Sequence, residues 1–263
     1  MSVVSLPSAT APVWPAVARE RRKAELLASL RRRIEAMESP APRPGALPVL
    51  GFGLAAIDEA LPGGGLKPTA LHEAVGSAAA LPAFAALLAG RRLGQGAAGP
   101  VLWCASRAGL YPPGLAAFGL RPERLLLVRA GERRQVLWAM EEALASGRTA
   151  LVVGEAGRLD LAQSRRLQLA AESGATPALL LGLEAPAGAS AAVTRWRVES
   201  APSGPVTGHR GVGRLRLRLA LARCRGGRPG AWLVEWDDAT HTLDLVAVLG
   251  DGPALPQAEA RRA

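Results

Sequence analysis

The sequence predicts an α/β protein built on a doubly wound, mainly parallel sheet. Between residues 50 and 183, short and almost continuously apolar runs alternate with amphipathic helical stretches. Strands that are apolar on both faces are typical of a parallel sheet covered by helices on both sides. After residue 185 the helical stretches stop, and strands joined by turns follow one another. This change predicts antiparallel strands added at one edge of the sheet.

The elements of the core follow from this pattern in chain order. Apolar runs predict strands at 70–75, 101–106, 125–130, 150–155 and 178–183. Amphipathic stretches between them predict helices near 80–93, 113–119, 131–146 and 159–173. The later runs predict the added strands at 194–200, 214–223, 231–238 and 242–249. We therefore assign residues 50–250 to one core and residues 251–263 to a flexible tail.

The N-terminal part is expected to lie apart from this core. Residues 1–15 contain Pro and Ser and are predicted to be disordered, whereas residues 16–39 are predicted to form an amphipathic helix. Residues 40–49 are rich in Pro and predict an extended linker, so the helix need not pack on its own core. Spacings of four, four and three residues place its apolar stripe on Leu26, Leu30, Ile34 and Met37.

Composition excludes several classes of protein. The apolar runs are too short to cross a bilayer and the first residues lack the pattern of a signal peptide, so we expect a cytoplasmic protein. Two cysteines and three scattered histidines lack metal-ligand spacing, so no metal is expected. The net charge of +10 is typical of proteins with an anionic partner such as nucleic acid. It is also typical of the Arg-, Ala-, Gly- and Pro-rich composition that GC-rich coding produces.

One late strand carries alternating charge. In the run RLRLRLALAR, arginines alternate with leucines, which places the two residue types on opposite faces of the strand. Arginines near tryptophans could hold a single-stranded nucleic acid or a protein partner. A half-exposed edge strand that is guarded by charge gives the same pattern. The candidate contact residues are Arg214, Arg216, Arg218, Arg223, Arg225 and Arg228.

Residues 71–90 predict a strand, a turn of small residues and a helix, the arrangement that holds a phosphate loop. In a Walker A loop, G-x-x-x-x-G-K-[ST], Lys neutralises phosphates and the hydroxyl holds magnesium. Alignment on Gly76 places Leu81, Pro82 and Ala83 at the last three positions, which therefore offer no ammonium group and no hydroxyl. Weak anion binding by amides at the start of the helix and an ordinary turn both remain open.

Residues 51–76, GFGLAAIDEALPGGGLKPTALHEAVG, are similar to the segment that leads into the ATP site of RecA-type recombinases. That family has a Gly-x-x-x-(Leu/Ile)-Asp element, a Gly-Gly-Gly-Leu turn and a strand that ends at the phosphate loop. The matching positions are Gly53, Ile57, Asp58, Gly63 to Leu66 and Leu71 to Gly76.

The same resemblance locates carboxylates that the chain lacks. The family's catalytic glutamate falls on Arg107, and the aspartate of its Walker B strand falls on Gly154. Glu155 follows one residue late, and side chains alternate faces along a strand, so we expect it to point away from the aspartate position. The polar end of the next strand, which senses the γ-phosphate, is replaced by residues 182–184. The resemblance thus implies a RecA-like fold that is not an enzyme and holds no cofactor.

Within the RecA-like group, the chain resembles the ImuA family of recombinase-related accessory proteins. The resemblance spans roughly residues 50–238 and implies a role in SOS mutagenesis by translesion synthesis. The implied partners are ImuB, an inactive Y-family-like polymerase, and an error-prone C-family polymerase, while contact with the recombinase or DNA stays open. It is carried by the segments LPGGGL, PVLWC, GLAAFGLRPERLLLVRA, VLWAMEEAL, LDLAQSRRLQLAAE, TRWRVESAPS and RCRGGRPGAWLVEWDD.

RecA-type proteins assemble by placing an N-terminal helix on the neighbouring core. The resemblance therefore makes the helix at 16–39 the candidate docking arm, either for a partner or for self-association. Two alternatives from other classes are an ATPase with an unconventional phosphate loop and a DNA-binding protein that uses its arginine strand.

Overall fold

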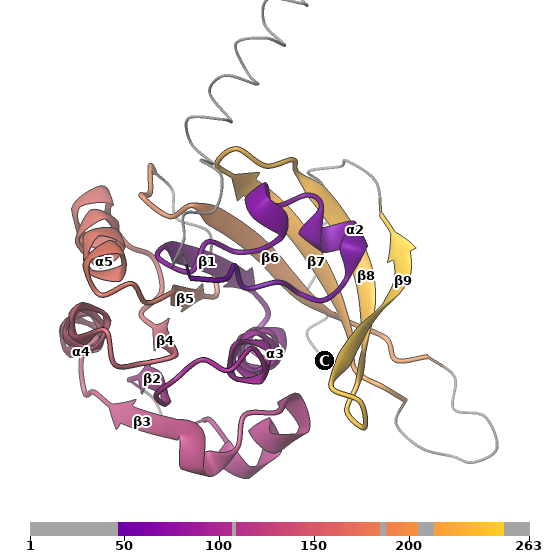
Figure 1. Ribbon diagram of the computed structural model, residues 1–263, viewed down its shortest axis with the longest axis horizontal. Helices are drawn as coiled ribbons and strands as arrows, with labels where there is room; N and C mark the ends of the chain where they lie inside the picture. Colours follow the sequence, from indigo (N-terminus) through magenta and orange to yellow (C-terminus); the bar gives the residue numbers. More distant parts are fainter. Residues whose placement is uncertain (1–46, 107–108, 185–187, 205–212, 250–263) are drawn as a thin grey trace, which may run out of the picture. The chain divides into compact units, whose positions relative to one another are not determined.

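The computed structural model describes residues 47–106, 109–184, 188–204 and 213–249 (Figure 1). These residues form a nine-stranded sheet with the order β3-β2-β4-β5-β1-β6-β7-β8-β9. The strands are β1 Leu71–Gly76, β2 Val101–Ala105, β3 Leu125–Arg129, β4 Leu151–Glu155, β5 Ala178–Gly182, β6 Thr194–Ala201, β7 Arg216–Cys224, β8 Gly230–Asp237 and β9 Thr242–Val248.

The pairing confirms the predicted sheet. Strands β3, β2, β4, β5, β1 and β6 pair in parallel, whereas β6, β7, β8 and β9 pair antiparallel at one side. Antiparallel pairing begins one strand later than the change of pattern after residue 185, because β6 is still parallel to β1. The alternation in β6 reflects burial of one face, on which Trp196 and Val198 are fully buried, and not the direction of the strand.

The helices cover both faces of the parallel strands, as expected of a doubly wound sheet. In Figure 1, α4 and α5 lie on one side of the strands and α3 on the other. The expected helix at 113–119 is instead a 3₁₀ helix. The helices are α2 Ala55–Asp58, α3 Ala80–Gly94, α4 Arg133–Ser146 and α5 Leu161–Ser173, with 3₁₀ helices η1 Pro62–Gly64, η2 Pro112–Phe118 and η3 Pro122–Arg124.

Two of the helices begin at reciprocal caps. Asp160 accepts a hydrogen bond from the amide of Gln163, whose side chain bonds back to the cap, at the start of α5. Glu132 and Gln135 form the equivalent capping box of α4. These pairs satisfy amides that have no partner inside the helix and fix the first turns at the ends of β3 and β4.

The sheet has a core on each face. On the α3 face, Phe52, Phe84, Trp196 and Trp232 form a chain of rings whose centroids lie 5.0 to 6.2 Å apart. On the other face, residues of α4 such as Met140 pack with strands of the parallel part and with α5. Aromatic clusters of this kind bury large areas and stabilise the added strands against the parallel part.

Several predictions fall outside the described residues. They are the disordered segment 1–15, the helix 16–39 with its stripe of Leu26, Leu30, Ile34 and Met37, most of the linker 40–49, Arg107 and the tail 251–263. None of the helices in the described part of the chain combines the length and hydropathy that crossing a bilayer requires.

Candidate functional site

The expected nucleotide site lies at the carboxyl ends of the parallel strands, and its first residue is Gly76 at the end of β1. This glycine has a φ of 151°, and a Cβ here would collide with the carbonyl oxygen of Val198 in β6. The amide of Ser77 donates to that same oxygen at 3.1 Å. The close approach of β1 and β6 therefore requires a glycine at this position, independently of any phosphate.

The turn after β1 closes on itself. The carbonyl oxygen of Ser77 accepts hydrogen bonds from the amides of Ala80 and Leu81, both at 3.1 Å. The Ser77 hydroxyl oxygen also accepts from Ala80 at 3.3 Å. A phosphate loop instead leaves its amides pointing at the ligand. In this turn those two donors are already satisfied by the chain.

The three residues aligned with the end of the Walker A pattern lie in the first turn of α3. The side chain of Leu81 is 4% exposed and belongs to the core on the α3 face. Pro82 and Ala83 are half-buried. Pro82 is tolerated because an amide in the first turn has no partner within the helix. The positions of the missing Lys and hydroxyl are thus part of the packing of α3.

The Walker B position at Gly154 is filled by a neighbour. A Cβ at Gly154 would meet the sulfur atom of Met140 in α4, so the end of this side chain occupies the space where a carboxylate would lie. Glu155 points to the opposite face, as the sequence analysis expected, and that is the face covered by α3. Its Oε1 accepts a hydrogen bond from the indole of Trp103 at 2.8 Å. The carboxylate is therefore held by a fully buried tryptophan.

The ends of β4 and β5 are bridged by the chain between β4 and α5. The amide of Gly157 donates to the carbonyl oxygen of Leu181 at 3.2 Å. An exposed ion pair joins Arg158 to Glu184 at 3.4 Å. Of the residues at the predicted γ-phosphate-sensing position, 182–184, Leu183 is 65% exposed and Glu184 is held by this exposed ion pair.

The RecA-like element Gly53 to Asp58 has a structural role here. The carboxylate of Asp58 accepts hydrogen bonds from the amides of Phe52, Gly53 and Leu54 at 2.7, 2.9 and 3.2 Å. These bonds close the turn that enters α2 and place Phe52 in the aromatic core. A carboxylate that accepts three amides is fully used by the fold.

His72 in β1 is a buried neutral residue. Its Nδ1 lies 2.8 Å from the hydroxyl of Thr194, and its Nε2 donates to the carbonyl oxygen of Lys67 at 2.9 Å. Burial lowers the pKa of His72 to about 4, because the charged imidazolium is poorly solvated there. Both ring nitrogens are therefore satisfied in the neutral form, and no metal-ligand cluster of His, Cys, Asp or Glu occurs among the described residues.

The arginine strand β7 is not an edge strand, which corrects one explanation of its pattern. It lies between β6 and β8, and the edges of the sheet are β3 and β9. Leu217 and Leu219 are buried, whereas Arg218 is exposed. The alternation arises because one face of β6 to β9 carries the core and the other carries charged side chains.

Two of the predicted contact arginines are engaged within the sheet. Arg214 pairs with Asp237 at 2.9 Å, and Arg216 pairs with Glu235 at 2.6 Å. Burial alone would raise the pKa of Asp237, but the amides of Ala239 and Thr240 and the Arg214 guanidinium hold it below its usual value. These ion pairs reduce the positive charge that β7 presents to a ligand.

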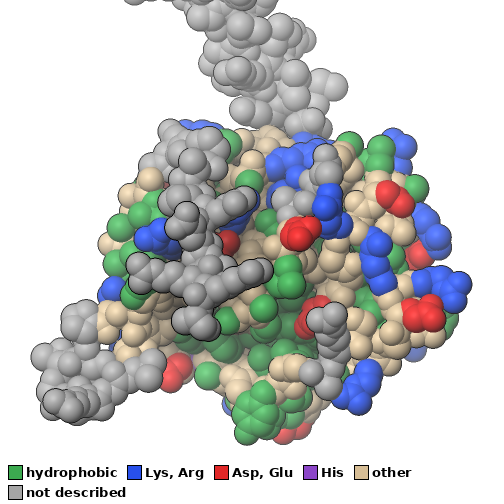
Figure 2. Space-filling model, turned by 180° about the vertical axis from the view of Figure 1, so that it is seen from behind, with side chains coloured by type: hydrophobic (Ala, Val, Ile, Leu, Met, Phe, Trp, Pro, Cys, Tyr) green, Lys and Arg blue, Asp and Glu red, His purple; other side chains and the backbone are tan. Residues whose placement is uncertain are grey.

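The remaining predicted arginines lie toward the far end of β7 and the turn after it. Arg223 donates to the carbonyl oxygen of Ser190 at 3.0 Å, while Arg225 and Arg228 are exposed. On the face of the molecule opposite to that of Figure 1, basic side chains are interspersed with hydrophobic and acidic ones (Figure 2).

A buried ion pair at the β1 to β6 junction was not anticipated. Glu73 is 2% exposed, pairs with Arg195 at 2.8 Å and accepts a hydrogen bond from the hydroxyl of Ser190. The signal in the sequence is a glutamate inside an otherwise apolar strand, since such a residue is rarely buried without a partner. This pair fixes β6 beside β1.

Comparison with known proteins gives close relatives. The chain is similar to Protein ImuA of Caulobacter vibrioides, in strains NA1000 / CB15N and ATCC 19089 / CIP 103742 / CB 15. Each is 38% identical over 241 residues, covering 82% of this chain and 96% of the relative. No protein-family model matches the chain. Among solved structures, SulA from Pseudomonas aeruginosa matches with a TM-score of 0.40 and 27% identity, covering 44% of this chain and 100% of SulA.

Proposed function

The chain belongs to the ImuA family, and on that premise we propose that it is a non-catalytic, RecA-like accessory protein of error-prone translesion DNA synthesis. It acts in the cytoplasm during the SOS response, through contacts with polymerase subunits. The partners implied by the family resemblance are an ImuB-like Y-family polymerase homologue and an error-prone C-family polymerase. The resemblance to RecA-type proteins supports a docking role for the helix at 16–39.

The non-catalytic part of the proposal is supported most by the turn after β1. Hydrogen bonds from Ala80 and Leu81 to Ser77 occupy amides that a phosphate loop directs at its ligand. Leu81, which aligns with the second glycine of the loop, is packed in the core, and Met140 lies against Gly154 at the position of the usual aspartate. An ATPase with an unconventional loop would need other groups for the roles of the lysine and the aspartate.

A second candidate function is direct DNA binding. It is favoured by the exposed arginines Arg218, Arg225 and Arg228, which form no ion pair within 4.0 Å among the described residues. Exposed arginines can neutralise phosphates and make the affinity depend on salt. The ion pairs of Arg214 and Arg216 weigh against a strong site on β7 itself.

The proposal is tested with purified protein, ATP and magnesium. We expect no hydrolysis above a buffer blank and no magnesium-dependent binding of nucleotide by calorimetry. ATP turnover that survives purification and disappears with a substitution in residues 76–83 would refute the non-catalytic assignment.

A further inference from the structure

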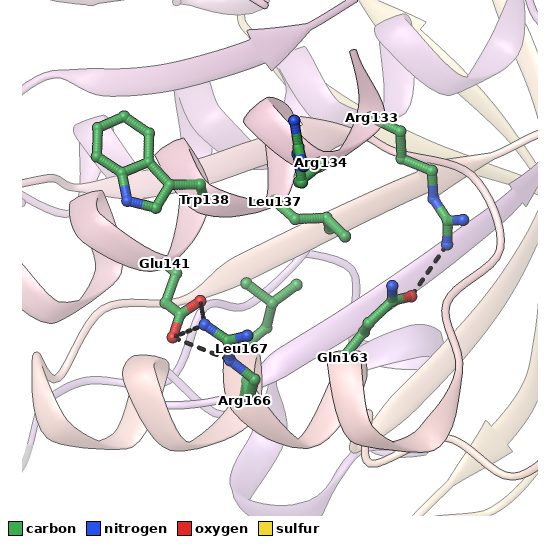
Figure 3. Close-up of a pocket in the computed structure, with 8 residues that line it drawn as sticks. All are labelled: Arg133, Arg134, Leu137, Trp138, Glu141, Gln163, Arg166 and Leu167. Atoms are coloured by element: carbon green, nitrogen blue, oxygen red, sulfur yellow. Dashed lines mark hydrogen bonds and ion pairs between the residues drawn. The ribbon is translucent and has the colours of Figure 1, made fainter.

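A hollow of about 480 Å³ lies on the surface between α4 and α5. It is lined by residues of these two helices and is separate from the strand ends described above. Its floor is apolar and consists of Leu137 from α4 and Leu167 from α5, the latter 2% exposed. In Figure 3 these two leucines point toward one another between the helices. A floor of this kind accepts an aliphatic or aromatic side chain.

Two polar bridges across the helices close the ends of this floor (Figure 3). At one end, Arg166 donates to both carboxylate oxygens of Glu141, at 2.9 and 2.7 Å. At the other end, Arg133 donates to the side-chain oxygen of Gln163 at 3.1 Å. The bridges fix the two helices relative to each other. The hollow is therefore formed before any ligand arrives, which lowers the entropic cost of binding.

The rim carries an exposed tryptophan. Trp138 is 64% exposed, and the side chain of Arg134 beside it is 86% exposed. Trp and Arg are the residue types that most often dominate the affinity of protein interfaces. A second hollow of about 450 Å³ shares Arg133 and Gln163 with the first and extends the surface to Leu161, which is 45% exposed. The two hollows together, which we call the α4–α5 groove, suit a peptide segment better than a single small molecule.

The charge of the groove indicates the chemistry of its ligand. Four arginines line it, at positions 133, 134, 158 and 166, against two carboxylates, Glu141 and Asp160. Glu141 is engaged in its bridge to Arg166, and Asp160 in the cap of α5. Arg134 and Arg158 lie 3.5 and 3.4 Å from Glu132 and Glu184, but these pairs are exposed and therefore weak, and Arg133 has no carboxylate within 4.0 Å among the described residues. The groove therefore favours a negatively charged ligand with an apolar anchor.

We propose that the α4–α5 groove binds an acidic segment of a protein partner, whose apolar side chain enters between Leu137 and Leu167. This inference rests on the proposed function only in requiring a protein partner. Single-stranded nucleic acid would also meet arginines and a tryptophan. The apolar floor favours a peptide, because Leu137 and Leu167 accept an aliphatic or aromatic side chain and offer no polar partner to a phosphate.

The test uses the full-length chain and three fluorescein-labelled peptides of equal length. The first has a central Leu-Phe pair flanked by glutamates, the second has Ser-Ser at its centre, and the third has lysines in place of the glutamates. We expect fluorescence anisotropy to show binding of the first peptide, with the other two weaker by about tenfold or more. An oligo-dT strand of similar length serves as the nucleic-acid probe.

Substitutions on the rim of the groove test whether the peptide binds there. Trp138→Ala and Arg134→Glu should each weaken binding of the Leu-Phe peptide by about tenfold. Matched controls are Tyr111→Ala, where the side chain is 71% exposed outside the groove, and Arg148→Glu, also exposed outside it. The controls should not change the affinity, and all four variants should melt at the temperature of the unaltered chain.

Three outcomes overturn the inference: equal binding of the Ser-Ser peptide, affinity unchanged by Trp138→Ala, or oligo-dT binding through Trp138 without peptide binding. The proposed function is judged separately, by complex formation with the purified ImuB-like protein. If the peptide test fails while that complex still forms, the inference about the groove is refuted and the proposed function stands. If the peptide binds but no polymerase complex forms, the proposed function is refuted and the inference about the groove stands.

Discussion

Gly76, Leu81 and Gly154, which the resemblance aligns with the two glycines of the phosphate loop and with the Walker B aspartate, each have a packing role in this chain. Gly76 allows β1 to approach the carbonyl group of Val198, and Gly154 makes room for Met140. Leu81 is buried in the core on the α3 face. Changing Leu81 to the glycine of the ATPase pattern would therefore remove a buried side chain from this core.

Gly76→Ala should lower the free energy of unfolding by about 1–3 kcal/mol, because its Cβ would meet main-chain atoms of β6 at a positive φ. Gly94→Ala is the matched control, since a Cβ at this helical glycine meets nothing within 4 Å. It should leave stability unchanged or raise it by up to about 1 kcal/mol. Chemical denaturation measures both. Equal effects would show that the close approach at Gly76 has no energetic weight.

The buried His72 should make stability depend on pH. Its pKa is about 4 in the folded chain against the ordinary 6.5, so between these values the unfolded chain binds more protons. The free energy of unfolding should therefore be fully retained above pH 6.5 and fall as pH decreases toward 4, by up to about 3 kcal/mol in total. Urea denaturation of the chain and of His72→Gln should show a shallower pH dependence in the variant. Parallel curves would contradict a buried neutral His72.

Alignment on Gly76 predicts from local spacing alone which residues stand at the positions of the lysine and the hydroxyl, and this stays a prediction. Contacts between distant residues are a different case. The bond between Trp103 and Glu155 joins residues 52 positions apart. The contact of Met140 with Gly154 depends on how α4 lies on the sheet. Neither could be derived from one sequence, since both depend on tertiary packing.

Among the elements, strands and helices were predictable where burial is uniform. The core strands and the helices α3, α4 and α5 match the predicted ranges within a few residues, since their patterns reflect burial on two faces or on one stripe. The pairing direction of β6 and the interior position of β7 could not be predicted from the sequence. A half-buried strand shows the same alternation of apolar and polar residues wherever it lies in a sheet.

If the chain binds DNA through β7, the ion pairs of this strand determine how strongly the DNA affinity depends on salt. Arg214 and Arg216 are engaged by Asp237 and Glu235, and Arg218 is exposed. Changing all three to Gln should lower the log–log slope of affinity against salt by about one unit, and Arg218→Gln alone should reproduce it. A loss of three units would mean that the ion pairs open on binding. If the slope of log affinity against log salt concentration does not change, β7 does not contact DNA.

The docking helix predicted at 16–39 is tested by charge on its apolar stripe. Leu30→Asp together with Ile34→Asp should abolish association with a partner or a second copy, because a narrow apolar seam is unstable unless it is covered. Size-exclusion chromatography and pull-down measure association, and thermal melting measures the core. Ala28→Asp is a control on the same segment, on the side of the predicted helix opposite the stripe. Retained association, or loss of the cooperative transition, would contradict a docking arm separate from the core.

For the molecule as a whole, the family and the geometry support the same function from different directions. The relatives assign the chain to the ImuA family. At the ends of the parallel strands, the turn after β1 closes on Ser77, Met140 lies against Gly154, and Gly157 bonds to Leu181. For the proposed function, the α4–α5 groove and the segment before the core are the candidate contact regions.

The most direct test of this account measures the affinity of the purified chain for the ImuB-like polymerase homologue by calorimetry, with and without magnesium and ATP. We predict that the complex forms and that its dissociation constant is the same in both conditions within experimental error, because the chain binds its partner without using nucleotide. The account would be contradicted by the absence of a complex, or by a complex that forms only with ATP and is released as the ATP is hydrolysed.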